Sequence, residues 1–306
     1  MLTIIWAILW AVSLRTVQDF DERTYEIYVP ASYTAQEPAP LLLVLHGAGG
    51  TGARSQGWLG LDALAEESGF IVVYPDGIDH NWDVGTGIPT ADGPIRSDDV
   101  AFLVWLVDHI GTRYTLDRTR IYAAGMSNGA LMAYKLACAA PDTFAAVAGV
   151  AAPLYVPVIR DCSETPMSIL MIHGTDDRIL PWNRVQLNNG QLFGLSAIDS
   201  FSFWAKRNGC NQDPAAITGE ILPDVDPDDQ STVRRIMLSD CEANTQVVLY
   251  GIEGGGHTWP GRPFDVDIEL GALNRDIDAS AIIMDWLVNL PARQQAEATP
   301  EVSVSP

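Results

Sequence analysis

A serine placed between two glycines, at the junction of an apolar strand and a helix, is the feature that most constrains this chain. The pentapeptide runs from Gly125 to Gly129, with Ser127 at its centre. Residues 120–124 before it are β-prone and apolar, and residues 130–137 after it are rich in helix formers. The glycines let the strand and the helix pass closely, while the serine takes strained backbone angles. The motif therefore predicts a strand, a sharp turn and a helix within a layered α/β structure.

Segments typical of buried strands alternate with segments typical of helices along the rest of the chain. Continuous apolar runs such as 40–45 are typical of strands that are covered on both faces. The expected strands are 25–29, 40–45, 71–74, 120–124, 144–148, 168–172 and 246–250, and the expected helices are 98–114, 130–137 and 281–288. This order predicts a mostly parallel central sheet with helices on both faces.

A serine nucleophile needs a base that is held by an acid, and both residue types follow Ser127 after later strands. The strand ending at residue 172 leads into Asp176 and Asp177, and we expect Asp177 to be the acid. Asp176 is the alternative, because spacing does not separate adjacent carboxylates. A glycine-rich loop after the strand 246–250 leads into His257, the only histidine after these acids, which we expect to be the base. The competing interpretation is that all three side chains are structural.

Two backbone N–H groups are expected to stabilise the oxyanion of the reacting ester or amide carbonyl. One belongs to Asn128, directly after the serine. The other is assigned to Ala48, in the small-residue loop 46–50 that follows a buried strand. A phosphate-binding loop is the alternative for 46–50, but the Lys and Ser/Thr of a P-loop are missing.

The net charge of the chain limits the kinds of molecule that it can bind. The 306 residues carry a formal net charge of −21, and 47% of them are hydrophobic. Such a charge argues against binding to nucleic acids and to anionic membranes, since both require a basic face. We attribute the acidity to solubility, with a role in substrate choice as the alternative. The sequence does not indicate an oligomeric state.

The ends of the chain differ in composition from its body. Residues 1–17 contain an apolar run, too short to cross a bilayer, that resembles a secretory signal peptide without its basic start. An N-terminal anchor or a wrongly assigned start is the alternative. Residues 291–306 are polar and are predicted to be a disordered tail. We therefore expect one catalytic domain, 18–290, and a secreted protein, either extracellular or periplasmic, with no membrane span.

Four cysteines lack any C-x-x-C spacing, which argues against zinc and thioredoxin-like chemistry. In an exported protein they predict two disulfides, for which three connectivities exist. The sequential one, Cys138–Cys162 with Cys210–Cys241, closes the shortest loops. Four buried free thiols in a cytosolic protein are the alternative.

Several motifs together resemble the secreted polyhydroxybutyrate depolymerase and feruloyl esterase group of carbohydrate esterase family 1-like α/β-hydrolases. The matching segments are 45–47, 97–103, 125–129, 173–177, 207–210 and 255–261, with the later Cys241. The likeness covers residues 23 to 290, and the run from His257 to Gly261 is particularly specific.

The resemblance implies an α/β-hydrolase fold, which we expect to lack a large lid domain. It also implies Ser127, Asp177 and His257 as a catalytic triad and the two sequential disulfides. The expected function is that of a serine carboxylic-ester hydrolase with an acyl-enzyme intermediate, which requires no metal and no organic cofactor. Its expected substrates are feruloyl or acetyl esters of plant polysaccharide, or short hydroxyalkanoate esters.

Substrate choice is less constrained than the chemistry. Trp82, Trp182 and Trp259 are candidate substrate-binding walls, although each is also explained by core packing. Members that attack insoluble polymer often carry an added binding domain, so we expect soluble esters or oligomers here. The alternatives are a serine peptidase or acyltransferase on the same fold, and a non-catalytic binding protein on a hydrolase scaffold.

Overall fold

A computed structural model describes residues 20–85, 89–90, 93–94, 97–213, 217–263 and 269–293. The predicted signal segment 1–17 and the residues after 293 lie outside this range. None of the helices in the described part of the chain has the length and apolar character needed to cross a membrane.

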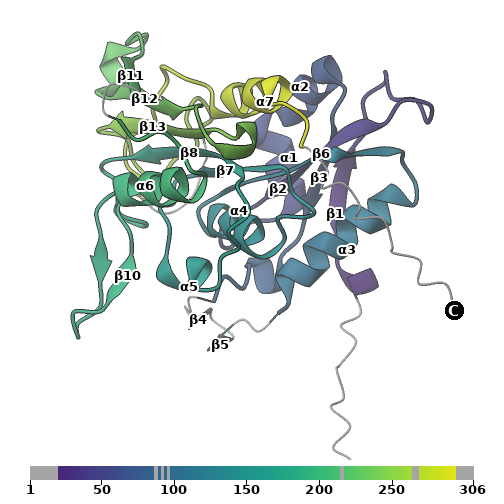
Figure 1. Ribbon diagram of the computed structural model, residues 1–306, viewed down its shortest axis with the longest axis horizontal. Coiled ribbons are helices and arrows are strands. Elements are labelled where there is room, and N and C mark those ends of the chain that lie inside the picture. The colour runs from purple at the N-terminus through teal and green to yellow at the C-terminus, as the bar shows by residue number, and fades with distance from the viewer. Residues whose placement is uncertain are drawn as a thin grey trace, which may run out of the picture.

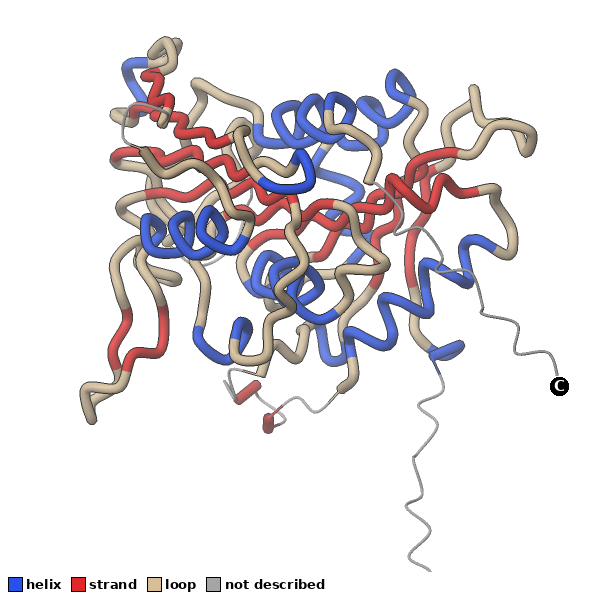
Figure 2. Tube along the Cα trace, viewed as in Figure 1, coloured by secondary structure: helices blue, strands red, loops and turns tan. Residues whose placement is uncertain are grey.

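A nine-stranded twisted sheet forms the centre of the molecule (Figures 1 and 2). Its strands, in spatial order, are β1 (Tyr25–Tyr28), β3 (Ile71–Pro75), β2 (Ala39–Leu45), β6 (Leu116–Met126), β7 (Ala146–Val150), β8 (Ser168–Gly174), β13 (Val247–Glu253), β12 (Thr232–Leu238) and β11 (Thr218–Ile221). The strands from β3 to β13 run parallel, while β1, β12 and β11 each pair antiparallel with a neighbour. The predicted mostly parallel sheet is confirmed.

Two short strand pairs lie outside the central sheet. They are β4 (Pro89–Thr90) with β5 (Gly93–Pro94), and β9 (Val185–Gln186) with β10 (Leu192–Gly194). The β9–β10 pair forms an arm that projects from the body of the molecule in Figure 1.

Helices cover both faces of the sheet because its central strands are apolar on both sides. One face carries α3 (Asp99–Gly111), α4 (Asn128–Ala139), α5 (Val156–Ile159) and α6 (Ala197–Arg207), and the other carries α1 (Gly52–Leu59), α2 (Leu61–Ser68) and α7 (Ala279–Asn289) (Figure 1). Strand β2 illustrates the alternation, since Leu41, Leu43 and Leu45 pack on the first face. Leu42 and Val44 pack on the second.

Several elements were not expected from the sequence. The antiparallel strands β11 and β12 and the helices α1, α2 and α6 all lie where no element was assigned. The helix expected over 98–114 begins one residue later and ends at Gly111, with the Asp98 side chain accepting from the Ala101 N–H at 3.0 Å. Strand β6 is longer than the expected 120–124.

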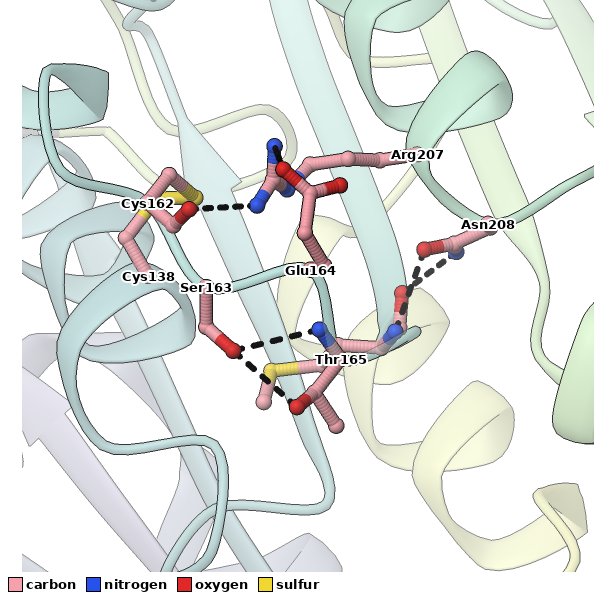
Figure 3. Close-up of a disulfide and its surroundings, with 8 residues drawn as sticks. Cys138, Cys162, Ser163, Glu164, Thr165, Arg207 and Asn208 are labelled. Carbon is pink, nitrogen blue, oxygen red and sulfur yellow. Dashed lines mark hydrogen bonds and ion pairs between the residues drawn. A yellow bond between two sulfur atoms is a disulfide. The ribbon is translucent and has the colours of Figure 1, made fainter.

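Two disulfides are present, one joining α4 to the segment between α5 and β8 and one joining the residues after α6 to those after β12. They are Cys138–Cys162 and Cys210–Cys241, the sequential pairing expected above. Figure 3 shows the first, beside which Arg207 donates to the Cys162 carbonyl and lies 3.3 Å from Glu164. These contacts fix the segment between α5 and β8 against the C-terminal end of α6.

The last described residue is fastened at the edge of the sheet opposite the carboxyl ends of the parallel strands. The Arg293 N–H donates to the Thr119 carbonyl at 3.2 Å, near the start of β6. Its guanidinium donates to the carbonyls of Pro141, Asp142 and Phe144, which precede β7. The chain therefore leaves the described fold on the side away from Ser127.

Candidate active site

Ser127 occupies a strained turn between β6 and α4. Its backbone angles are φ 56° and ψ −119°, in a region that non-glycine residues rarely adopt. The flanking glycines are required by close contacts. A Cβ on Gly125 would lie 2.4 Å from the Gly129 carbonyl carbon, and one on Gly129 would lie 2.1 Å from the Leu45 carbonyl oxygen. The sequence thus presents Ser127 at the carboxyl end of β6, where the strand and helix touch.

The two adjacent carboxylates after β8 have different environments. Asp177 is 4% exposed, and its Oδ1 accepts from the N–H groups of Ile179 and Leu180, both at 2.8 Å. Its Oδ2 lies 2.7 Å from His257 Nδ1. Asp176 is exposed and accepts from the hydroxyl of Thr175 at 3.2 Å. The structure therefore brings Asp177, rather than Asp176, to His257.

His257 and Ser127 line one cavity of about 220 Å³. The loop that carries His257 is packed too closely for side chains, since a Cβ on Gly256 would lie 2.2 Å from the Leu270 carbonyl oxygen. The His257 N–H donates to that same carbonyl at 2.6 Å. The glycines after β13 therefore allow the loop to lie against residue 270, and this contact fixes the backbone of His257.

The loop 46–50 forms another wall of the cavity. Gly49 has φ 75°, and its N–H donates to the His80 carbonyl at 2.8 Å. Among the described residues, the N–H groups of Ala48 and Asn128 have no backbone acceptor. These two donors are therefore available to a ligand, as the predicted oxyanion site requires.

Trp82, one of the tryptophans expected to bind substrate, lies outside the lining of the cavity that holds Ser127. Its side chain is 1% exposed and is absent from the wall of the cavity that holds Ser127. Its Nε1 donates to the His46 carbonyl at 3.0 Å, and its ring lies 5.0 Å from the His46 ring. The Trp82 indole therefore packs beneath the loop 46–50 and holds it, and its role as a substrate wall stays a prediction.

Trp259 and Trp58 form the aromatic part of the cavity wall. Their rings meet edge to face with centroids 6.1 Å apart, and Trp259 Nε1 donates to the Ser280 hydroxyl at 3.0 Å. Trp58 was not expected from the sequence, because α1 was not assigned. Once α1 is recognised, Ser55, Trp58 and Leu59 share one helical face directly after the loop 46–50. Trp182 lines a separate hollow.

A second histidine lies beside the acid. His173 is 1% exposed, and its Nδ1 is 3.9 Å from Asp177 Oδ2. Burial lowers the pKa of His173 to about 4 despite the nearby Asp177. Burial likewise lowers the pKa of His46. Both imidazoles are therefore neutral at pH 7, and His173 adds no formal charge beside Asp177. Within the described residues, no group of three or more His, Cys, Asp or Glu side chains is arranged to hold a metal ion.

Comparison with known proteins relates the chain to esterases. Residues 23–178 match the family described as "Esterase PHB depolymerase". A protein of Nocardia uniformis subsp. tsuyamanensis named as an esterase, NocK, is 28% identical over 87% of this chain and 79% of its own length. Feruloyl esterase B of Piromyces equi is 29% identical over 74% of this chain, which spans only 41% of that enzyme.

A solved structure gives the fold independently. The acetyl xylan esterase from Aspergillus awamori matches with a TM-score of 0.56 and 20% identity, over 89% of this chain and 97% of that one. This likeness identifies the α/β-hydrolase fold. The family match, residues 23–178, covers just over half of this chain. The chain therefore belongs to the Esterase PHB depolymerase family and is a carboxylic ester hydrolase.

Proposed function

We propose that the chain hydrolyses carboxylic esters through an acyl-enzyme formed on Ser127. The Ser127 hydroxyl attacks the ester carbonyl while His257 takes its proton, and Asp177 fixes the imidazole and stabilises its charged form. His257 then protonates the leaving alkoxide. In the second step the same imidazole activates a water molecule that hydrolyses the acyl-serine and releases the acid.

The observation that carries this proposal is the 2.7 Å contact of His257 Nδ1 with Asp177 Oδ2, together with the cavity that His257 shares with Ser127. That contact leaves Nε2 as the ring nitrogen that can accept the serine proton. The free N–H groups of Ala48 and Asn128 support oxyanion stabilisation at the same place. Removing one such donor typically costs roughly 2.7–4 kcal/mol of transition-state stabilisation.

We further propose that the substrates are esters on plant polysaccharide, with acyl groups larger than acetyl preferred. The cavity of about 220 Å³ exceeds the size of an acetyl group. The half-buried Trp58 supplies an apolar wall, and Trp259, which is 1% exposed, packs edge to face behind it. Relatives named as feruloyl esterases and a structural neighbour named as an acetyl xylan esterase support the polysaccharide class. Trp259, one of the three tryptophans expected from the sequence to bind substrate, is among the lining residues of this cavity, which supports the proposal. Short hydroxyalkanoate esters are the competing acyl donors.

Secretion is part of the same proposal. Two disulfides persist in an oxidising compartment, whereas the cytosol keeps thiols reduced. We assign residues 18–290 to one catalytic domain and keep 1–17 as the predicted signal peptide. Export from a bacterial host, followed by N-terminal sequencing of the product, tests the cleavage.

A single assay tests the catalytic proposal. Hydrolysis of 4-nitrophenyl butyrate is measured for the wild type, Ser127→Ala and the control Ser202→Ala, whose hydroxyl is exposed on α6. We expect Ser127→Ala to lose at least about 10³-fold in kcat and Ser202→Ala to keep the wild-type value. Equal rates for Ser127→Ala and the wild type would refute the acyl-enzyme. Methyl ferulate, acetylated xylan and hydroxybutyrate trimer then rank the substrates.

A further inference from the structure

A second hollow, of about 290 Å³, is lined by residues of α6 and of the neighbouring strands β12 and β13. Trp182 is its aromatic wall, and Ile198 on α6, which is 45% exposed, belongs to its apolar lining. The hollow shares no lining residue with the cavity of Ser127, so it is a distinct site.

The Trp182 indole is held in a fixed position on the sheet. It stacks on the His173 ring, with the ring centroids 5.8 Å apart and an angle of 11° between the ring planes. Gly251 pairs with His173 on β8 and with Arg234 on β12, so it separates these two residues across the sheet. A Cβ on Gly251 would lie 2.9 Å from Trp182 Cη2, so the glycine makes the space into which the indole fits.

The rim of the hollow carries charged groups of opposite sign. Arg234 and Glu253 are both exposed and line it from the neighbouring strands β12 and β13. In the described part of the chain, neither makes an ion pair. A guanidinium donor and a carboxylate acceptor can hydrogen-bond the paired hydroxyls of one ligand, since each hydroxyl both donates and accepts.

Trp182 is connected to the candidate catalytic residues through measured contacts. It stacks on His173, whose Nδ1 is 3.9 Å from Asp177 Oδ2, and that oxygen is 2.7 Å from His257 Nδ1. The segment between Asp177 and Trp182 also places Ile179 on the wall of the cavity that holds Ser127. The hollow therefore lies beside that cavity, on the other side of this segment.

We infer that the hollow binds a neutral sugar unit of the polysaccharide chain that carries the ester. The C–H face of a pyranose packs on a fixed indole, and its hydroxyls fit the Arg234–Glu253 rim. The net charge of −21 disfavours polymers rich in uronic acids, so the sugar is a neutral one. This inference rests on the proposed function for its choice of polysaccharide, and its test measures binding separately from hydrolysis.

The experiment measures binding of xylotetraose, a neutral sugar chain with no ester, by calorimetry. The proteins are the wild type, Trp182→Ala, Arg234→Ala and the control Arg235→Ala. Arg235 is the next residue on β12 but points to the other face of the sheet, where it pairs with Glu220 at 2.6 Å. We expect Kd to rise about tenfold in Trp182→Ala and in Arg234→Ala, equivalent to about 1.4 kcal/mol. We expect Arg235→Ala to match the wild type.

Hydrolysis gives the second readout. Acetylated xylotetraose and 4-nitrophenyl acetate are compared in the wild type and Arg234→Ala, because Trp182 also contacts His173. We expect Arg234→Ala to raise KM about tenfold for the sugar ester only. Absence of xylotetraose binding to the wild type, or an unchanged Kd in both variants, would overturn the sugar site. Variant-sensitive binding without hydrolysis of any ester would keep the sugar site and overturn the proposed function.

Discussion

The side chain of Asn128 hydrogen-bonds both backbone groups of Trp82. The Trp82 N–H donates to Asn128 Oδ1 at 2.7 Å, and Asn128 Nδ2 donates to the Trp82 carbonyl at 3.1 Å. Because the Trp82 indole in turn donates to the His46 carbonyl, this amide connects the two backbone donors of the proposed oxyanion site. The Asn128 side chain thus contributes to fixing the loop 46–50 relative to Ser127.

Asn128→Ala removes this connection but keeps the backbone N–H of residue 128. We expect kcat on 4-nitrophenyl butyrate to fall by up to about 100-fold, with a smaller change in KM, because a donor displaced by about 1 Å loses most of its effect on the transition state. Asn289→Ala, at the exposed end of α7, is the matched control and should leave kcat unchanged. A wild-type kcat for Asn128→Ala would contradict the role of the side chain.

The adjacent carboxylates provide an internal comparison. Asp177→Asn keeps the size of the side chain and removes the charge 2.7 Å from His257 Nδ1. We expect kcat to fall by about 10³–10⁴-fold, because the imidazole loses its preferred tautomer and the partner of its charged form. Asp176→Asn, at an exposed position, should stay within about threefold of the wild type. The reverse order of effects would assign the acid to Asp176.

Two glycine-to-alanine substitutions distinguish the effect of a close backbone contact on stability from the effect of helix propensity. Gly129→Ala places a Cβ 2.1 Å from the Leu45 carbonyl oxygen and 2.5 Å from that of His46. We expect a loss of about 3 kcal/mol or more in the free energy of unfolding, since two backbones must separate. Gly57→Ala, on α1 with open space around it, should instead gain about 0.5–1 kcal/mol. Urea unfolding measures both, and equal effects would refute the contact argument.

Stability should depend on pH through His173. Its pKa is about 4 in the folded chain and 6.5 as the ordinary value, so the unfolded chain binds more protons between these values. The free energy of unfolding therefore decreases as pH falls from about 6.5 to about 4, by about 3 kcal/mol from this group. His173→Phe keeps a flat ring against Trp182 and removes the titration.

Urea unfolding at several pH values between 4 and 7 measures this contribution. We expect a shallower loss of stability towards acid in His173→Phe than in the wild type. His80→Asn removes an exposed imidazole and should retain the wild-type dependence. If His173→Phe and the wild type lost stability in parallel, another group would be responsible.

The parallel centre of the sheet could be predicted because its strands carry their own pattern. Continuous apolar runs such as β2 and β8 require burial on both faces, and Gly125 to Gly129 fix a turn within five residues. Strands β11 and β12 escaped prediction because β12, which is second from the edge of the sheet, mixes charged and apolar residues without a clean alternation. Strand β12 is placed by its pairing with β13, and β11 by its pairing with β12, rather than by local sequence.

The site could be predicted only in part for a similar reason. Ser127, Asp177 and His257 follow strands, so their place at one edge of the sheet follows from the chain order. Chain order does not predict which tryptophans line the cavity. Whether Trp82 is buried and Trp58 reaches the cavity wall depends on how α1 and the segment before Trp82 pack. Asp177 differs from Asp176 through two N–H contacts that form only when the loop after β8 has folded.

The hydrogen bonds that hold Arg293 affect how the protein can be attached to a solid support. Three carbonyls before β7 hold this side chain at the edge of the sheet remote from Ser127. A resin or electrode coupled beside Arg293 itself would lie at the edge of the sheet opposite the one that carries Ser127. Attachment at that edge should therefore leave the residues around Ser127 uncovered by the support.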